Sequence, residues 1–306
     1  MARIKDKFVR QWIIENAEDI VPEYDPGILT IRGIHYRLVA RGMTNTPQHY
    51  KRVVAAMGVA RWDGIIPFET FFDHERSMEG KTKAEAMDVE DEILTAKKNI
   101  RIYMECYYRN KWENQIYYPE VFIEKNALLG VFGVVCKKQG VILGGCKGYP
   151  SLTYLYAARE RFEDAVDRGQ IPIILYFGDY DPSGEDIPRS IRDNLLRLGV
   201  DVEVRRIALL EEQVIEWNLP PAPTKEYKID KRKDGSIGYV GDSRDKNWNG
   251  LGQVELDAVE PHKLQELCRD AIESVFDGSV HDDLMEIESE ERERYVRELK
   301  DFVDNI

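Results

Sequence analysis

Short apolar runs and longer amphipathic stretches alternate along residues 117–210. The apolar runs are rich in β-prone residues, and the stretches between them carry apolar positions at helical spacing. The strand-like runs are YYPEVFIE at 117–124, GVILGGCKGYP (a strand and a turn) at 140–150, IPIILYFGDYD at 171–181 and VDVEVRRIAL at 200–209. This alternation predicts an α/β fold with a mainly parallel sheet, in which functional groups lie at the carboxyl ends of the strands.

The chain before this region has a helical pattern. Apolar spacing favours a helix over 4–20. Thr30 is a candidate N-cap for a second helix over IRGIHYRLVARG. Thr46 and Pro47 suit the N-cap and first position of a third helix that reaches about Gly58.

The sequence ARWDGIIPFETFF, at 60–72, is expected to form a short β-hairpin or wing after the third helix. Short helices followed by a wing predict a winged helix-turn-helix DNA-binding domain over 1–76. Its helix TPQHYKRVVAAM would face DNA. A plain three-helix bundle without a ligand fits the same pattern.

Two other segments complete the predicted organisation. Residues 77–116 are charged and favour a helical linker. Residues 211–306 form a C-terminal extension, mostly helical, with a loop rich in Lys, Asp and Gly and a charged amphipathic helix at its end.

The stretch ILYFGDYDPSGEDI carries the strongest chemical signal in the chain. Asp179 and Asp181 are two residues apart at a strand end, so an extended backbone points both carboxylates the same way. Glu124 ends an earlier strand and belongs on the same rim of the sheet. Hard oxygen ligands in this arrangement suit Mg²⁺. An Asp-rich loop without a metal is the alternative interpretation.

The residues after these aspartates predict how the next helix begins. Pro182 and Gly184 favour a turn, after which Ser183 or Asp186 would help to start a helix.

Charge is distributed unevenly along the chain. The net charge is −13, but the C-terminal segment from Leu251 holds 17 acidic and 6 basic residues. Between Asp25 and Asp63 there is no acidic residue, whereas this stretch contains Arg32, Arg37, Arg41, Lys51, Arg52 and Arg61. Local field matters more than net charge for phosphate binding, so a nucleic-acid partner stays possible. A solvated basic face is the alternative.

Cysteine and apolar content favour a cytoplasmic protein with no membrane partner. The four cysteines are scattered without a CxxC pair, which is typical of reduced thiols. The N-terminus lacks a signal peptide, and no apolar run approaches the roughly 18 residues needed to cross a bilayer.

A Glu at one strand end and DxDxxG at another resemble the Toprim fold, a Rossmann-like domain of topoisomerases, primases and nucleases. The sequence KGYPS, at Lys147–Ser151, is similar to the version found in topoisomerase VI A subunits and the meiotic double-strand-break transesterase. Those proteins place a winged-helix domain with an R-x-x-x-Y motif before Toprim, and Arg32 to Tyr36 occupies the matching position. The resemblance covers about residues 28–210 and predicts a Toprim domain over 117–210.

The resemblance implies a function. Tyr36 would attack a phosphodiester of double-stranded DNA, helped by Arg32, with Mg²⁺ held by Glu124, Asp179 and Asp181. Candidate DNA contacts are Arg37, Arg41, Lys51, Arg52 and Lys147. The family also implies a homodimer and a separate ATPase subunit.

Two alternatives remain open at this stage. A Toprim nuclease would hydrolyse DNA with metal-activated water, and Tyr36 would then be a structural aromatic residue. A non-catalytic DNA-binding subunit of a larger ATPase machine would retain the acidic rim without using it.

Overall fold

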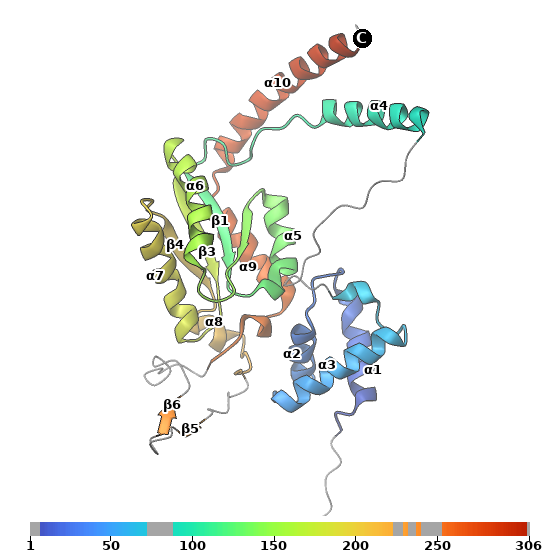
Figure 1. Cartoon of the computed structure of the whole chain (residues 1–306), viewed down its shortest axis with the longest axis vertical. Helices are drawn as coiled ribbons and strands as arrows, with labels where there is room; N and C mark the ends of the chain where they lie inside the picture. Colours follow the sequence, from blue (N-terminus) through green and yellow to red (C-terminus); the bar gives the residue numbers. More distant parts are fainter. Residues whose placement is uncertain (1–6, 72–87, 223–228, 232–236, 240–252, 305–306) are drawn as a thin grey trace, which may run out of the picture.

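The computed structural model describes residues 7–71, 88–222, 229–231, 237–239 and 253–304, and its centre is a parallel β-sheet. The four strands are β1 (Tyr117–Ile123), β2 (Ile142–Gly145), β3 (Ile171–Phe177) and β4 (Glu203–Ala208). Their order is β2-β1-β3-β4, and all neighbours are parallel. The predicted α/β class with a parallel sheet is confirmed (Figure 1).

Helices cover both faces of the sheet because successive strand residues point to opposite sides. On one face, Ile173, Leu175 and Phe177 share a core with helices α5 (Leu129–Gln139) and α9 (Pro261–Glu273). On the other face, apolar side chains of β1 and β3 pack against α6 (Leu152–Asp167) and α7 (Pro182–Arg197), as Phe122, Ile174 and Tyr176 show. The helix α9 belongs to the C-terminal extension, which therefore forms part of the α/β core.

The N-terminal unit contains α1 (Arg10–Ile20), α2 (Ile31–Ala40) and α3 (Pro47–Trp62) around a core of its own. Both predicted caps are confirmed. The Thr30 hydroxyl accepts a hydrogen bond from Gly33 N–H at 2.8 Å, and the Thr46 hydroxyl accepts one from His49 N–H at 3.2 Å.

The predicted hairpin or wing at 60–72 is wrong over its described residues, 60–71. Helix α3 continues to Trp62 instead of ending near Gly58, and the rest contains only a turn and a short 3-10 helix, η2 (Phe68–Thr70). Ala60 is fully buried in the helical core, so packing extends the helix past the expected end.

The remaining elements connect and extend these units. The linker contains α4 (Val89–Glu105), and a short helix α8 (Glu211–Glu216) follows the sheet. The predicted Lys-, Asp- and Gly-rich loop includes an antiparallel pair, β5 (Ile229–Lys231) and β6 (Ile237–Tyr239). A long helix, α10 (Gly278–Asp304), ends the described chain and, like α4, projects from the α/β body (Figure 1). Among the described residues, no helix has the length and apolarity that a membrane span requires.

The segment 253–258 returns to the carboxyl end of β3. Val254 and Tyr180 exchange backbone hydrogen bonds of 2.8 and 3.0 Å, and η5 (Leu256–Ala258) follows. Because parallel strands β1 and β3 end at the same edge, this segment lies beside the predicted acidic rim.

Candidate functional site

Glu124 lies immediately after β1, at the carboxyl edge of the sheet. Its backbone N–H donates to the carbonyl of Phe177 at 2.9 Å, and its carboxylate Oε2 accepts from Asp179 N–H at 2.9 Å. Burial, reinforced by the nearby Asp181 carboxylate, raises the pKa of Glu124. The structure thus brings Glu124 against Asp179, and Asp181 lies near enough for its charge to act on Glu124.

Two glycines leave the space that this arrangement needs. A Cβ on Gly178 would stand 2.8 Å from Glu124 Oε2 and 2.6 Å from the Tyr176 hydroxyl. A Cβ on Gly184 would stand 2.1 Å from the Asp179 carbonyl oxygen. Gly184 is therefore required by close packing inside the first turn of α7, whereas the sequence suggested a turn.

Asp179 is almost completely buried and both of its carboxylate oxygens have partners. Oδ1 accepts a hydrogen bond from Leu256 N–H at 2.8 Å, and Oδ2 lies 3.0 Å from the Lys125 ammonium. Burial raises the pKa of Asp179 to about 7, opposed by the positive charge of Lys125.

Lys125 is an internal cation of the site. Its Nζ lies 3.4 Å from Glu255 Oε2 and 3.3 Å from Asp257 Oδ1, in addition to its contact with Asp179. Burial lowers the pKa of Lys125, but the three carboxylates outweigh this effect and raise it above its usual range. We refer to Lys125, Asp179, Glu255 and Asp257 as the Lys125 cluster.

Sequence reasoning missed Lys125, Glu255 and Asp257. Lys125 follows Glu124 directly, so its place on the rim could have been inferred. Glu255 and Asp257 gave no such signal, because their position depends on the pairing of Val254 with Tyr180 across more than seventy residues of chain.

Tyr36 and Arg32 contact the same cluster from the N-terminal unit. The Tyr36 hydroxyl donates to Glu255 Oε2 at 3.3 Å, and the Arg32 guanidinium pairs with the same oxygen. Tyr36 is only 3% exposed. Burial and the Glu255 carboxylate raise the pKa of Tyr36, although Lys125 and Arg32 act in the opposite direction.

Asp181 serves as the N-cap of α7. Its Oδ1 accepts from Gly184 N–H at 2.7 Å, and Pro182 occupies the first helical position. The prediction that Ser183 or Asp186 helps to start this helix is therefore wrong, since the Asp181 side chain already satisfies the first turn. Asp186 instead accepts hydrogen bonds from Tyr149 and Arg189, each at 2.7 Å.

The predicted three-carboxylate metal site is not preassembled. Within the described residues, no group of three or more His, Cys, Asp or Glu side chains is arranged to hold a metal ion. Both carboxylate oxygens of Asp179 already have partners, Lys125 and the Leu256 N–H. Glu124 and Asp181 are the other two carboxylates of the predicted site that could bind a cation. Two carboxylates fit Mg²⁺, because this ion usually keeps several waters and binds substrate phosphates.

A cavity of about 580 Å³ opens over this rim. Its lining combines acidic and basic side chains, namely Arg32, Glu124, Lys125, Lys147, Asp179, Glu255 and Asp257, with Asn126, Ala127 and Gly148. An adjoining cavity of about 210 Å³ shares Arg32 and Glu255 and is also lined by Tyr36. Lys147 is exposed at the larger cavity, where it can reach an incoming anion.

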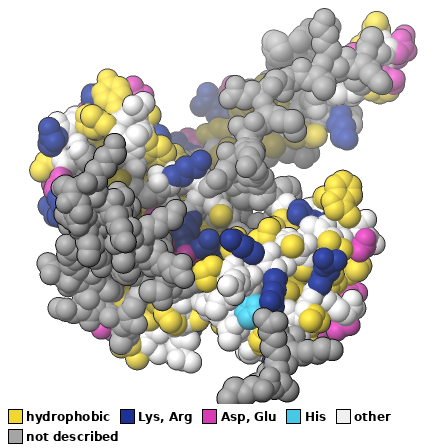
Figure 2. All heavy atoms as spheres, turned by 60° about the horizontal axis from the view of Figure 1, so that its bottom comes forward, with side chains coloured by type: hydrophobic (Ala, Val, Ile, Leu, Met, Phe, Trp, Pro, Cys, Tyr) yellow, Lys and Arg dark blue, Asp and Glu magenta, His cyan; other side chains and the backbone are white. Residues whose placement is uncertain are grey.

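The predicted DNA contacts divide into two groups. Arg37 donates to the carbonyl of Ala258 at 2.8 Å, and Arg41 lies 3.3 Å from Asp19, so both make contacts within the protein. Lys51, Arg52 and Lys147 are exposed, as is Arg41. Figure 2 shows Lys and Arg side chains gathered in and beside the hollow between the two lobes of the visible face.

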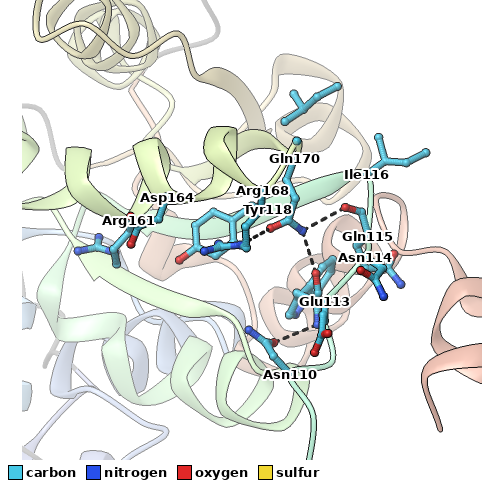
Figure 3. Close-up of a pocket in the computed structure, with 13 residues that line it drawn as sticks. Asn110, Glu113, Asn114, Gln115, Ile116, Tyr118, Arg161, Asp164, Arg168 and Gln170 are labelled. Atoms are coloured by element: carbon cyan, nitrogen blue, oxygen red, sulfur yellow. Dashed lines mark hydrogen bonds between the residues drawn. The ribbon is translucent and has the colours of Figure 1, made fainter. Parts of the chain in front are cut away.

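A larger cavity, of about 890 Å³, lies at the opposite end of the sheet (Figure 3). Arg161 on its wall pairs with the buried Glu120 at 2.7 and 2.8 Å, and Arg168 donates to Gln170 at 3.1 Å. Both arginines therefore already have hydrogen-bond partners within the protein. Ligands of open parallel sheets bind at the carboxyl ends of the strands, which favours the acidic rim as the candidate site.

No protein-family model, curated protein or solved structure matches this chain. Its function is therefore inferred from the chemistry of the site.

Proposed function

We propose that the protein is an Mg²⁺-dependent nuclease of Toprim type that hydrolyses DNA at the rim of Glu124, Asp179 and Asp181. The observation that carries the proposal is the convergence of Glu124, Asp179, Lys125 and Lys147 on one open cavity. Asp181 follows two residues after Asp179, at the start of α7. Carboxylates and cations in one water-accessible cavity suit the binding of a metal and a phosphodiester.

The residues have distinct roles in this proposal. Glu124 and Asp181 would hold Mg²⁺, which when bound neutralises phosphate charge and lowers the pKa of a coordinated water. Asp179 positions the Lys125 ammonium, 3.0 Å away, toward the cavity. Lys125 and Lys147 would attract the phosphate oxygens, and the exposed Lys51 and Arg52 would contact the DNA backbone further away.

The fold supports the same proposal. A glutamate follows β1, DxDxxG follows the adjacent parallel strand β3, and a helical unit with a basic surface precedes the sheet. We assign the α/β unit to the Toprim fold and the N-terminal unit to a helix-turn-helix domain on this basis.

A second candidate is a transesterase in which Tyr36 attacks the DNA. It is favoured by the direct link from Tyr36 through Glu255 to Lys125. In that reaction the Tyr36 oxygen would bond to phosphorus, the phenol proton would pass to Glu255, and the displaced DNA oxygen would leave. Hydrolysis is better supported, because Tyr36 is enclosed and its pKa is raised.

The test is cleavage of supercoiled and linear duplex DNA with Mg²⁺ or Mn²⁺. We expect Asp181→Asn and Glu124→Gln to lose at least about a hundredfold in rate, since they remove the metal-facing carboxylates. Asp193→Asn, on the exposed surface of α7, is the matched control and should cleave like the wild type. Hydrolysis requires that Tyr36→Phe remain active.

Two results would change the conclusion. A protein–DNA adduct formed by the wild type and absent from Tyr36→Phe would establish the transesterase. Absence of metal-stimulated cleavage, together with salt-sensitive DNA binding, would leave only a DNA-binding role.

A further inference from the structure

The side chains of helix α4 are not buried by the rest of the described structure. Every side chain described between Val89 and Tyr103 is exposed, including Val89 at 66%, Ile93 at 49% and Ile100 at 45%. A helix of 17 residues is close to the length at which isolated helices are marginal in water. Most helices of this length are stabilised by packing of an apolar face, so α4 requires a partner.

Five residues of α4 form one continuous stripe, and the apolar Leu94 and Ile102 lie outside it. Val89, Ile93, Ala96, Ile100 and Tyr103 are separated by alternating steps of four and three residues. This is the spacing of a coiled-coil seam, in which the same helix face contacts a second helix along its length. Ala96 lies at the middle of the stripe, where its small side chain lets two helices approach closely.

The charges of α4 specify the direction of the partner. The first half carries Asp88, Glu90, Asp91 and Glu92, and the second half carries Lys97, Lys98 and Arg101, with Glu105 at its end. A parallel second copy would place acidic residues opposite acidic residues. An antiparallel second copy places the acidic half of each helix opposite the lysines of the other, which is favourable.

The C-terminal end of α4 lies next to α10, which carries further basic side chains. The ring of Tyr103 lies 6.5 Å from that of Tyr295 on α10, so the two helices meet there. Next to Tyr295, the surface around Val296 is lined by three basic side chains, Arg292, Arg297 and Lys300, and one acidic side chain, Glu293. An antiparallel partner would bring its acidic first turn toward this basic surface.

We propose that α4 is a self-association surface and pairs antiparallel with α4 of a second copy of this chain. The interface is isologous, since each helix offers the same stripe and the same two charged halves. The inference depends on the contacts and charges of α4 and is independent of the cleavage reaction. Figure 1 shows α4 away from the α/β body, where a second copy can reach it.

The first experiment measures the mass of the full chain by light scattering and sedimentation over a concentration series. We expect a dimer for the wild type. Ile93→Asp should raise the dissociation constant by about tenfold or more, because it puts a charge in the apolar seam. Leu94→Asp is the matched control: Leu94 is 64% exposed but lies off the stripe, so this variant should remain dimeric.

A charge variant keeps the test informative if Ile93→Asp disturbs folding. Lys97→Glu with Lys98→Glu leaves Arg101 as the one basic residue of α4 and should also weaken the dimer, while the far-ultraviolet circular dichroism stays that of the wild type. A wild type that is monomeric at high protein concentration overturns the proposal. The proposal is also overturned if Ile93→Asp dimerises with the same dissociation constant as the wild type.

Cross-linking tests the antiparallel direction. In a Cys106→Ser background, which removes the exposed native thiol, Ala96→Cys should form a disulfide-linked dimer under mild oxidation. Val89→Cys should not, because antiparallel pairing holds the two copies of position 89 about 20 Å apart at 1.5 Å per residue. Equal cross-linking at both positions would indicate parallel pairing and refute the proposed arrangement.

Discussion

Lys125 is the residue on which the candidate site depends. It is a single ammonium surrounded by carboxylates from two separate parts of the chain, Asp179 at the rim and Glu255 and Asp257 in the returning segment. Charges this close and this poorly hydrated repel strongly unless they are balanced. The positive charge of Lys125 therefore lets the segment 253–258 lie against the acidic rim.

Replacement of Lys125 should be costly. Lys125→Met keeps the aliphatic volume but leaves Asp179 and Asp257 without their cation and Glu255 with Arg32 alone. We expect a loss of about 3–5 kcal/mol in the free energy of unfolding at neutral pH. Urea denaturation measures it. Lys147→Met, at an exposed position on the same cavity, should change stability by less than about 0.5 kcal/mol. If Lys125→Met were as stable as the wild type, the charge of Lys125 would not be what compensates the carboxylates of the cluster.

His35 should make the stability of the N-terminal unit depend on pH. It is 2% exposed, its Nε2 lies 3.1 Å from Asn45 Oδ1, and burial lowers its pKa from the usual 6.5. The unfolded chain then takes up a proton that the folded state resists. Stability is full above pH 6.5 and falls as the pH drops below it.

Thermal unfolding between pH 5 and 8 checks this direction. His35→Gln cannot be protonated, so it should unfold at a temperature that depends less on pH in this range than that of the wild type. An identical pH dependence in the two proteins would exclude His35 as its source.

At the scale of elements, the segment 253–258 completes the site by pairing its backbone with Tyr180. Val254 N–H donates to Tyr180, and Leu256 N–H donates to Asp179 one residue earlier. Two hydrogen bonds from neighbouring positions fix the direction in which Glu255 and Asp257 point. The position of this segment is therefore set by its backbone as well as by its charges.

Two substitutions at Val254 distinguish the contribution of its backbone N–H from that of its side chain. Val254→Pro removes the donor to Tyr180, whereas Val254→Ala keeps it. We expect faster hydrogen exchange at the amide of Leu256 and a loss of about 1–3 kcal/mol in stability of the segment with proline. Alanine should leave the exchange rate of Leu256 nearly unchanged. Slow exchange at Leu256 in the proline variant would contradict this account.

The same elements show how far the sequence alone could predict the structure. Local signals predicted the parallel strands and the caps at Thr30 and Thr46, because caps and strand runs depend on neighbouring residues. The wing at 60–72 failed because burial of Ala60 decides that region. Glu255 and Asp257 could not be found, because a contact between distant segments leaves no mark in local spacing.

At the scale of the whole molecule, charge is separated in space as well as in sequence. The net charge of −13 would repel DNA, yet Lys and Arg side chains gather beside the hollow on the face shown in Figure 2. The exposed Lys51 and Arg52 lie on α3 of the N-terminal unit. The local field of this face would dominate the approach of a polyanion.

DNA affinity should therefore depend on salt and on these side chains. Lys51→Glu with Arg52→Glu should weaken binding to duplex DNA of any sequence and reduce the slope of log affinity against log salt by about one to two. Fluorescence anisotropy in a KCl series measures this. Arg197→Glu, at the end of α7 far from the rim, is the control and should leave the slope unchanged. A slope unaffected by the double reversal would place the DNA elsewhere.

The return of segment 253–258 to the rim has a consequence for protein synthesis. Chains are made from the N-terminus, so Tyr36, Lys125 and Asp179 leave the ribosome long before Glu255 and Asp257. Until then Lys125 has only one of its three carboxylate partners, and Tyr36 and Arg32 have none of their contacts with Glu255. A chain that ends before residue 253 therefore lacks Glu255 and Asp257, and its Lys125 cluster stays incomplete.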